Sequence, residues 1–79
     1  MVLDRNGVEL RVGDYVVLSK HLFEVTRFKN ASGGRADVEI VRWSDKETDC
    51  FLSSWLEKVT DSEAMLYMIL DSAPVSPAL

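Results

Sequence analysis

Residues 61–79 contain no lysine or arginine, and the whole chain has one cysteine, two prolines and four glycines. The single cysteine, Cys50, cannot form an internal disulfide, so no covalent cross-link stabilises the domain. Low glycine and proline content with 47% apolar residues excludes collagen-like, low-complexity and wholly disordered chains. No segment approaches the ~20 apolar residues of a membrane span, and residues 1–7 show no signal-peptide pattern. We therefore expect a cytoplasmic protein.

Charge is divided unevenly along the chain. The net charge is −4, and residues 61–79 carry three acids, Asp61, Glu63 and Asp71, against no base. A nucleic-acid binder normally has a basic excess, because phosphate neutralisation supplies most of its affinity. The overall charge therefore argues against DNA or RNA binding. A local group of bases is interpreted as an ordinary mixed-charge strand surface; it comprises Lys20, Arg27, Lys29, Arg35 and Arg42.

Short apolar segments separated by turn signals predict a mainly β fold. Asn6-Gly7, between two apolar segments, predicts a hairpin. The clearest alternation places Ala36, Val38 and Ile40 on one face of a strand. Further strands are expected over 15–18, 21–28, 35–43, 49–52 and 56–59, with a flexible loop over 29–34, a polar turn over 44–47 and a 3₁₀ turn over 53–55.

A helix is predicted after the last strand. Thr60 and Glu63 have the spacing of a capping box, and an apolar run follows over 64–70. The expected organisation is a β-barrel over 1–60, a helix over 61–71 packed on the barrel or on a partner, and a flexible tail over 72–79.

Three sequence features resemble the SH3-like small barrels, including their KOW, Tudor-like and bacterial accessory-protein variants. They are Val12-Gly13-Asp14-Tyr15-Val16, the turn at Gly33-Gly34 and Ser53-Ser54-Trp55-Leu56-Glu57, which together span about residues 8–59. The resemblance implies an SH3-like barrel of five to six strands with a short C-terminal helix. It does not imply a function.

The interior of a barrel this small holds the side chains from only one face of each strand. We assign to its interior Val16, Leu18, Phe23, Val25, Ala36, Val38, Ile40, Phe51, Trp55, Leu56 and Val59. The opposite faces then carry Tyr15, Val17, Phe28, Val41 and Trp43. Either segment 61–70 folds back over these residues or a β-bulge changes the register. Alternatively they form a partner-binding surface, with Arg27 and Arg42 as its polar rim.

The predicted helix has an apolar surplus of its own. Its apolar residues span more than one turn, so they point in every direction around the helix axis. We therefore expect one side to pack on the barrel and another on a second chain. A homodimer, or docking on a larger protein, is predicted through 64–70, with Met65, Leu66, Met68 and Ile69 in the contact.

No motif for nucleotide binding, metal binding or nucleophilic catalysis is found, so no catalytic residue, metal or cofactor is expected. Cys50 is interpreted as a small buried residue and His21 as a polar residue at a loop edge, although a nucleophilic pair of the two stays open. Asp45, Glu47 and Asp49 are interpreted as a solvated turn.

The sequence thus favours a non-catalytic protein-binding module that modulates a larger partner, such as a small regulator or a phage- or plasmid-type accessory protein. One alternative is a single-strand nucleic-acid binder. It would use Tyr15, Phe28 and Trp43 as stacking platforms, and the local group of bases between Lys20 and Arg42 would follow the phosphate backbone. Another is a small oligomeric enzyme similar to type II dihydrofolate reductases. Their active-site strand is Val-Gln-Ile-Tyr, whereas this chain has Asp49-Cys50-Phe51-Leu52.

Overall fold

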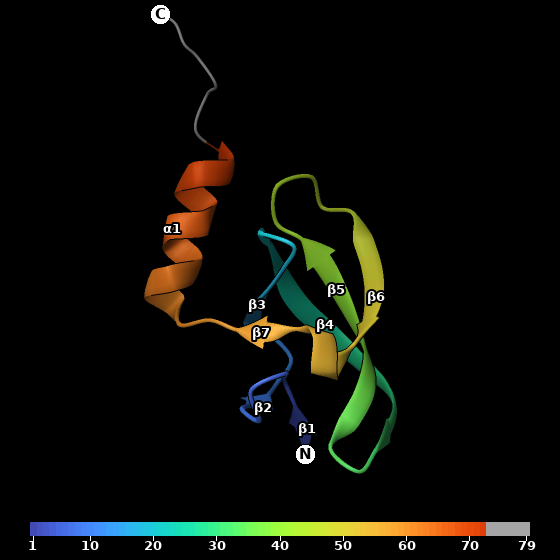
Figure 1. The fold of residues 1–79 in the computed structure, drawn as a ribbon. Helices are drawn as coiled ribbons and strands as arrows, with labels where there is room; N and C mark the ends of the chain where they lie inside the picture. The colour runs from blue at the N-terminus through green and yellow to red at the C-terminus, as the bar shows by residue number, and fades with distance from the viewer. Residues whose placement is uncertain (73–79) are drawn as a thin grey trace, which may run out of the picture.

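The structure, a computed structural model, describes residues 1–72, with residues 71 and 72 described by their backbone alone. The fold is mainly β with one C-terminal helix (Figure 1). In chain order its elements are β1 (Val2–Leu3), β2 (Glu9–Leu10), β3 (Tyr15–Leu18), β4 (His21–Ser32), β5 (Arg35–Arg42), β6 (Thr48–Leu52), the 3₁₀ turn η1 (Ser53–Trp55), β7 (Glu57–Lys58) and α1 (Asp61–Ser72). Apart from residue 72, the tail predicted over 72–79 lies outside the described residues.

The strands form two sheets. β1 and β2 make a small antiparallel pair, and the other strands form a five-stranded sheet in the order β6-β5-β4-β3-β7. Within residues 1–72 the strands do not close into a barrel, because β1 and β2 pair with each other and β6 remains at the edge of the larger sheet. The predicted mainly β class with a C-terminal helix is therefore confirmed, whereas the expected barrel of five to six strands is not closed.

The hairpin of β4 and β5 is longer than the sequence predicts. The segment 29–34, expected to be a flexible loop, continues β4 as far as Ser32 and turns only at Gly33-Gly34, where both residues have positive φ. Lys29 pairs with Asp37, and the Asn30 side-chain amide donates to Asp37 Oδ2 at 2.9 Å. Pairing with β5 therefore overrides the local loop preference of Asn30 and Ser32.

The main core lies on the inner face of the larger sheet. As predicted from their alternation, Ala36, Val38 and Ile40 are buried there. The other buried members are Val2, Leu10, Val16, Phe23, Val25 and Leu56, with Leu18, Phe28 and Phe51 packed against them.

The position of Phe28 is decided by a β-bulge. Val25 pairs with Ile40 and Arg27 with Glu39, so Thr26 is an extra residue in β4. The Thr26 hydroxyl donates to the Glu39 carbonyl at 2.9 Å. The bulge reverses the side-chain alternation beyond it, so Phe28 packs on the core and not on the outer face.

The prediction that Trp55 belongs to the core is wrong, because Trp55 is 57% exposed. Residues three apart share a face in a 3₁₀ turn. Ser53 and Leu56 are accordingly buried, and the Ser53 hydroxyl accepts the Ala36 N–H at 3.1 Å. Trp55 therefore points outward, where its ring stacks on Phe51 with a centroid separation of 6.3 Å.

A second core forms between the outer face of the sheet and α1 (Figure 1). Its buried residues are Leu22, Val59 and Ala64, and it is completed by Tyr15, Val17, Trp43, Tyr67 and Met68. Val59, predicted in the barrel interior, lies here instead. The predicted capping box is confirmed: Glu63 N–H donates to Thr60 Oγ1 at 3.1 Å, and Thr60 N–H donates to Glu63 Oε1 at 2.9 Å.

Candidate docking surface

The aromatic surface predicted on the outer face of the sheet is largely covered. Tyr15, Val17 and Trp43 are half-buried beneath α1, and Phe28 packs on the main core. Val41 is half-buried and belongs to neither core. The structure therefore brings only three of the five apolar residues together. Their role in partner binding stays a prediction.

The two predicted rim residues are engaged in ion pairs with acids of the same chain. Arg27 Nε lies 3.5 Å from Glu39 Oε1, on an exposed part of the sheet. Arg42 Nε lies 3.5 Å from Asp45 Oδ1 without hydrogen-bond geometry, and its guanidinium lies 5.9 Å from the centre of the Phe23 ring. Both arginines therefore make contacts within the chain, and their role as a polar rim stays a prediction.

Two of the bases proposed for a nucleic-acid path, Arg27 and Lys29, lie opposite acids on the neighbouring strand. Across β4, β5 and β6, one row is Arg27, Glu39 and Cys50, and the next is Lys29, Asp37 and Leu52. Alternating signs on one face cancel the potential that a phosphate backbone would meet. The arrangement resembles the solvated mixed-charge surface expected from the sequence.

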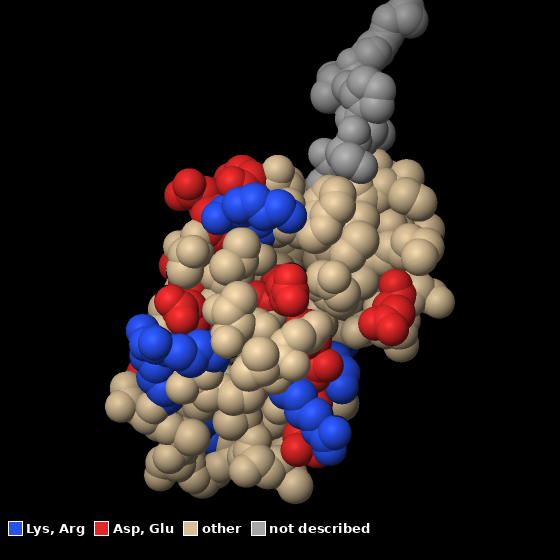
Figure 2. Space-filling model, turned by 180° about the vertical axis from the view of Figure 1, so that it is seen from behind, with Lys and Arg blue, Asp and Glu red and all other residues tan. Residues whose placement is uncertain are grey.

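The strongest candidate site is the outer side of α1. Ala64, Tyr67 and Met68 form the side that packs on the sheet, at the i, i+3, i+4 spacing of one helix face. Away from it lie four aliphatic side chains, called below the α1 surface. They are Met65 (61% exposed), Leu66 (63%), Ile69 (58%) and Leu70 (71%). Figure 2 shows this part of the molecule mostly uncharged, with one acidic group near one end.

The α1 surface matches the sequence prediction in part. Met65, Leu66 and Ile69 are exposed as the docking prediction requires, whereas Met68 is half-buried against the sheet. Leu70 was missed. The spacing of Ala64, Tyr67 and Met68 is the sequence signal that could have identified the inward side and left Leu70 with the outward residues.

The described residues show no constellation for catalysis. Within 1–72 there is no cluster of residues able to hold a metal ion and no pocket. Cys50 is exposed on the edge strand β6, contrary to the expectation that it is buried, and His21 is exposed at the start of β4. No hydrogen bond joins these two side chains in the described part of the chain.

Comparison with known proteins assigns neither a family nor a function to this chain. No helix among residues 1–72 has the length and apolar character needed to cross a membrane. No family model, curated protein or solved structure matches the chain.

Proposed function

We propose that this chain is a non-catalytic protein-binding module that docks on a larger protein through the α1 surface and modulates it. One observation carries the proposal. Four neighbouring aliphatic side chains are 58–71% exposed, although the opposite side of the same helix already packs on the sheet. Contiguous exposed apolar patches of this kind mark interaction sites in soluble proteins.

The energetics favour an external partner for these residues. Full burial of an aliphatic side chain stabilises a complex by about 1.5–3 kcal/mol relative to its exposed state. Within residues 1–72 the side chains of Met65, Leu66, Ile69 and Leu70 stay more than half exposed, because they project away from the sheet. A helix with one free apolar side fits a groove on another protein, and the flexible thioether of Met65 suits an adaptable contact.

Charge indicates the chemistry of the partner. The segment 61–72 contains Asp61, Glu63 and Asp71 and no base. A second copy of α1 would bring acids together in either orientation, since acids lie at both ends of the helix. A groove lined by apolar side chains and bordered by lysine or arginine would instead complement α1 in both respects. We therefore favour a basic-rimmed groove over the α1 homodimer that the sequence also permits.

The SH3-like barrel detail of the fold belongs to this proposal. A 3₁₀ turn precedes β7, the last strand of the larger sheet, and β7 pairs antiparallel with β3, the first. This order supports the resemblance. A compact β body carrying one docking helix suits a small regulator or a phage- or plasmid-type accessory protein.

A photo-crosslinking experiment in the native host tests the proposal. A photoreactive phenylalanine analogue replaces Ile69 in the full chain. In a matched control it replaces Val12, which is 61% exposed in the turn between β2 and β3. We expect a protein that is crosslinked from position 69 and not from position 12. Mass spectrometry then identifies it, and it is purified for binding measurements.

The binding measurements decide the outcome. Leu66→Lys with Ile69→Lys should weaken the affinity for the purified partner by at least about thirtyfold, which corresponds to ~2 kcal/mol. Val12→Lys should leave the affinity within about twofold, and all variants should keep the wild-type circular dichroism spectrum. Equal crosslinking from positions 69 and 12, or unchanged affinity of the double variant, would refute docking through α1.

A further inference from the structure

The outer edge of the larger sheet is formed by β6. Its pairing with β5 runs without a register shift from Asp37 opposite Leu52 to Val41 opposite Thr48. Soluble proteins usually block such edges with lysine, proline or a bulge, because unpaired main-chain groups invite a further strand. β6, Thr-Asp-Cys-Phe-Leu, has no lysine, proline or bulge. Its one charged residue is Asp49, which lies opposite Ile40 and is the only protecting charge on this strand. Figure 1 places α1 on the opposite side of the molecule, so the helix does not cover this edge.

The direction of the unpaired main-chain groups follows from one hydrogen bond. The Cys50 N–H donates to Asp49 Oδ1 at 2.9 Å, so it is directed away from β5. Successive residues of an antiparallel strand direct their main-chain groups to alternate sides. The N–H and C=O groups of Thr48, Cys50 and Leu52 therefore face the open side, called below the β6 edge.

We propose that a second copy of this chain pairs with the β6 edge, strand against strand and antiparallel, about a two-fold axis. With complete overlap of the two strands, Cys50 lies opposite Cys50 of the second copy. Thr48 then lies opposite Leu52, and Asp49 opposite Phe51. This proposal is independent of docking through α1.

The residues of β6 select this register. Centring the axis on Asp49 would place two carboxylates directly opposite each other, which is destabilising. Complete overlap avoids that and uses every outward main-chain group of Thr48, Cys50 and Leu52. The pairing is isologous, which means that both copies use the same strand, β6, in the interface. A closed dimer forms in which neither β6 edge remains open.

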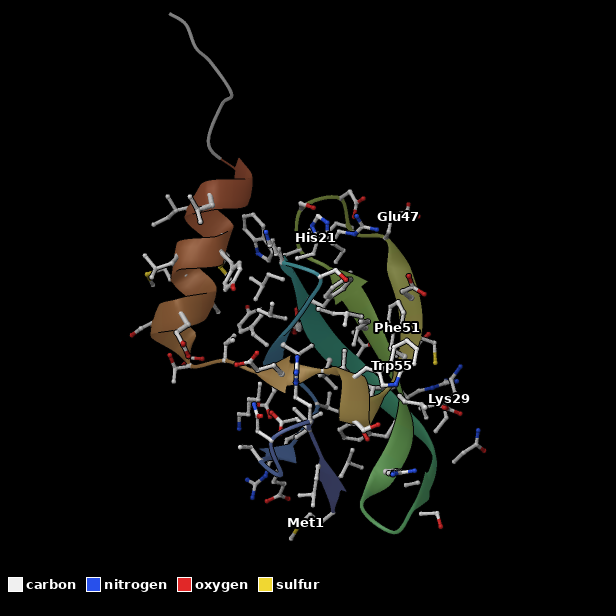
Figure 3. The ribbon with its side chains drawn as sticks, viewed as in Figure 1. Met1, His21, Lys29, Glu47, Phe51 and Trp55 are labelled. Carbon is white, nitrogen blue, oxygen red and sulfur yellow. The ribbon has the colours of Figure 1, made fainter. Side chains whose placement is uncertain are left out.

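The aromatic residues beside β6 gain a partner in this arrangement. Phe51 and Trp55 stack on each other next to the edge, as Figure 3 shows, and Trp55 is 57% exposed. Diagonal neighbours across an antiparallel pair lie within reach of aromatic side chains. The register puts Phe51 diagonal to Phe51 of the second copy, so the two stacked pairs meet on one face. The same register puts Asp49 diagonal to Asp49 of the second copy on that face, which opposes the pairing. Leu52, 42% exposed, packs beside Thr48 of the second copy on the other face.

Asp49 limits the strength of the pairing. Its carboxylate accepts the Cys50 N–H in the single chain, and this hydrogen bond must break before the same N–H can donate to a carbonyl of the second strand. Each copy also carries a net charge of −4, which opposes association at low salt. We therefore expect a dimer that strengthens with added salt and with removal of the Asp49 carboxylate.

Sedimentation equilibrium of the full reduced chain measures the dimerisation constant directly. We expect a monomer–dimer equilibrium that weakens more than tenfold in Leu52→Lys and in Thr48→Lys, two exposed positions of the β6 edge. Met65→Lys, on the α1 surface, is the matched control and should dimerise like the wild type. Asp49→Ala should dimerise several-fold more tightly. Circular dichroism verifies that each variant is folded.

A second measurement uses Cys50 as a reporter. Directly opposite residues with paired main-chain groups have Cα atoms about 5.5 Å apart, within the range that a disulfide spans. Diamide should therefore convert the reduced dimer to a Cys50–Cys50 disulfide, its azo group taking up the two electrons and two protons that the thiols lose. Leu52→Lys should crosslink at least tenfold more slowly than Met65→Lys.

Two results would overturn the proposal. One is a monomer at all concentrations up to millimolar in both wild type and Asp49→Ala. The other is a dimer that Met65→Lys abolishes and Leu52→Lys leaves intact, which would place self-association on α1. The first result leaves docking through α1 untouched, whereas the second would assign the α1 surface to a second copy. The two proposals therefore fail with different outcomes.

Discussion

The carboxylate of Asp4 accepts the main-chain N–H of Lys58 at 2.8 Å, although 54 residues separate the two in the chain. The other oxygen of the same carboxylate accepts the N–H groups of Asn6 and Val8, each at 2.8 Å. Asp4 is only 5% exposed. One buried side chain thus closes the first turn of the chain and also fixes the last strand, β7, against it.

Replacement of Asp4 by alanine removes the acceptor of three main-chain N–H groups. An unsatisfied buried donor costs about 1–3 kcal/mol, so we expect Asp4→Ala to lower the free energy of unfolding by about 3–5 kcal/mol. Urea unfolding followed by far-ultraviolet circular dichroism measures this. Asp45→Ala is the control, because Asp45 accepts the Glu47 N–H in an exposed turn. A similar loss in both variants would contradict the role of Asp4.

The two tryptophans should contribute unequally to stability. Trp43 is half-buried in the second core, with Lys46 Nζ 5.0 Å from the centre of its ring, whereas Trp55 is exposed. Trp43→Ala should cost about 2 kcal/mol, below the ~3–5 kcal/mol of a fully buried aromatic residue, and Trp55→Ala less than about 1 kcal/mol. Urea titrations of dilute protein compare them. The reverse order would show that the second core does not depend on Trp43.

The capping box should control the stability of α1 locally. Thr60→Ala removes the oxygen that accepts the Glu63 N–H, and loss of an N-cap costs about 1 kcal/mol. Hydrogen exchange of the amides over 64–70 should therefore accelerate by about fivefold. Ser62→Ala is the matched control, because no hydrogen bond of the Ser62 hydroxyl occurs in residues 1–72. Equal acceleration in both variants would exclude a specific cap.

Ser53 should matter more than its neighbour Ser54. Ser53 is fully buried, and its hydroxyl accepts the Ala36 N–H at 3.1 Å. Ser53→Ala leaves that N–H without an acceptor and should cost about 1–2 kcal/mol. Ser54→Ala should change the free energy of unfolding by less than about 0.5 kcal/mol. Parallel thermal and urea unfolding tests the difference, and indistinguishable variants would contradict it.

Features encoded by neighbouring residues could be predicted from the sequence. The hairpin at Asn6-Gly7, the 3₁₀ turn over 53–55 and the capping box of Thr60 and Glu63 all lie where their local patterns indicated. The alternation of Ala36, Val38 and Ile40 also identified the buried face of β5. In each case residues a few positions apart supply the hydrogen bond or the side-chain direction that defines the element.

The candidate site could be predicted only in part. The apolar composition of α1 indicated a docking surface, but the division between inward Met68 and outward Leu70 depends on how the helix lies on the sheet. The residues of β6 do not predict that it lies at an open edge, because an edge strand is defined by the absence of a neighbouring strand. That property belongs to the arrangement of all the strands.

Local residue patterns are sufficient to specify a mainly β chain that ends in a capped, apolar helix with more aliphatic residues than one packed side can use. Which apolar residues are buried and which are exposed follows from the packing of the strands and α1. The bulge at Thr26 turned Phe28 inward, η1 turned Trp55 outward, and α1 covered Tyr15 and Trp43. The physical reason is that burial depends on contacts between strands and helix distant in the chain, and a change of one residue in register reverses which face a side chain occupies.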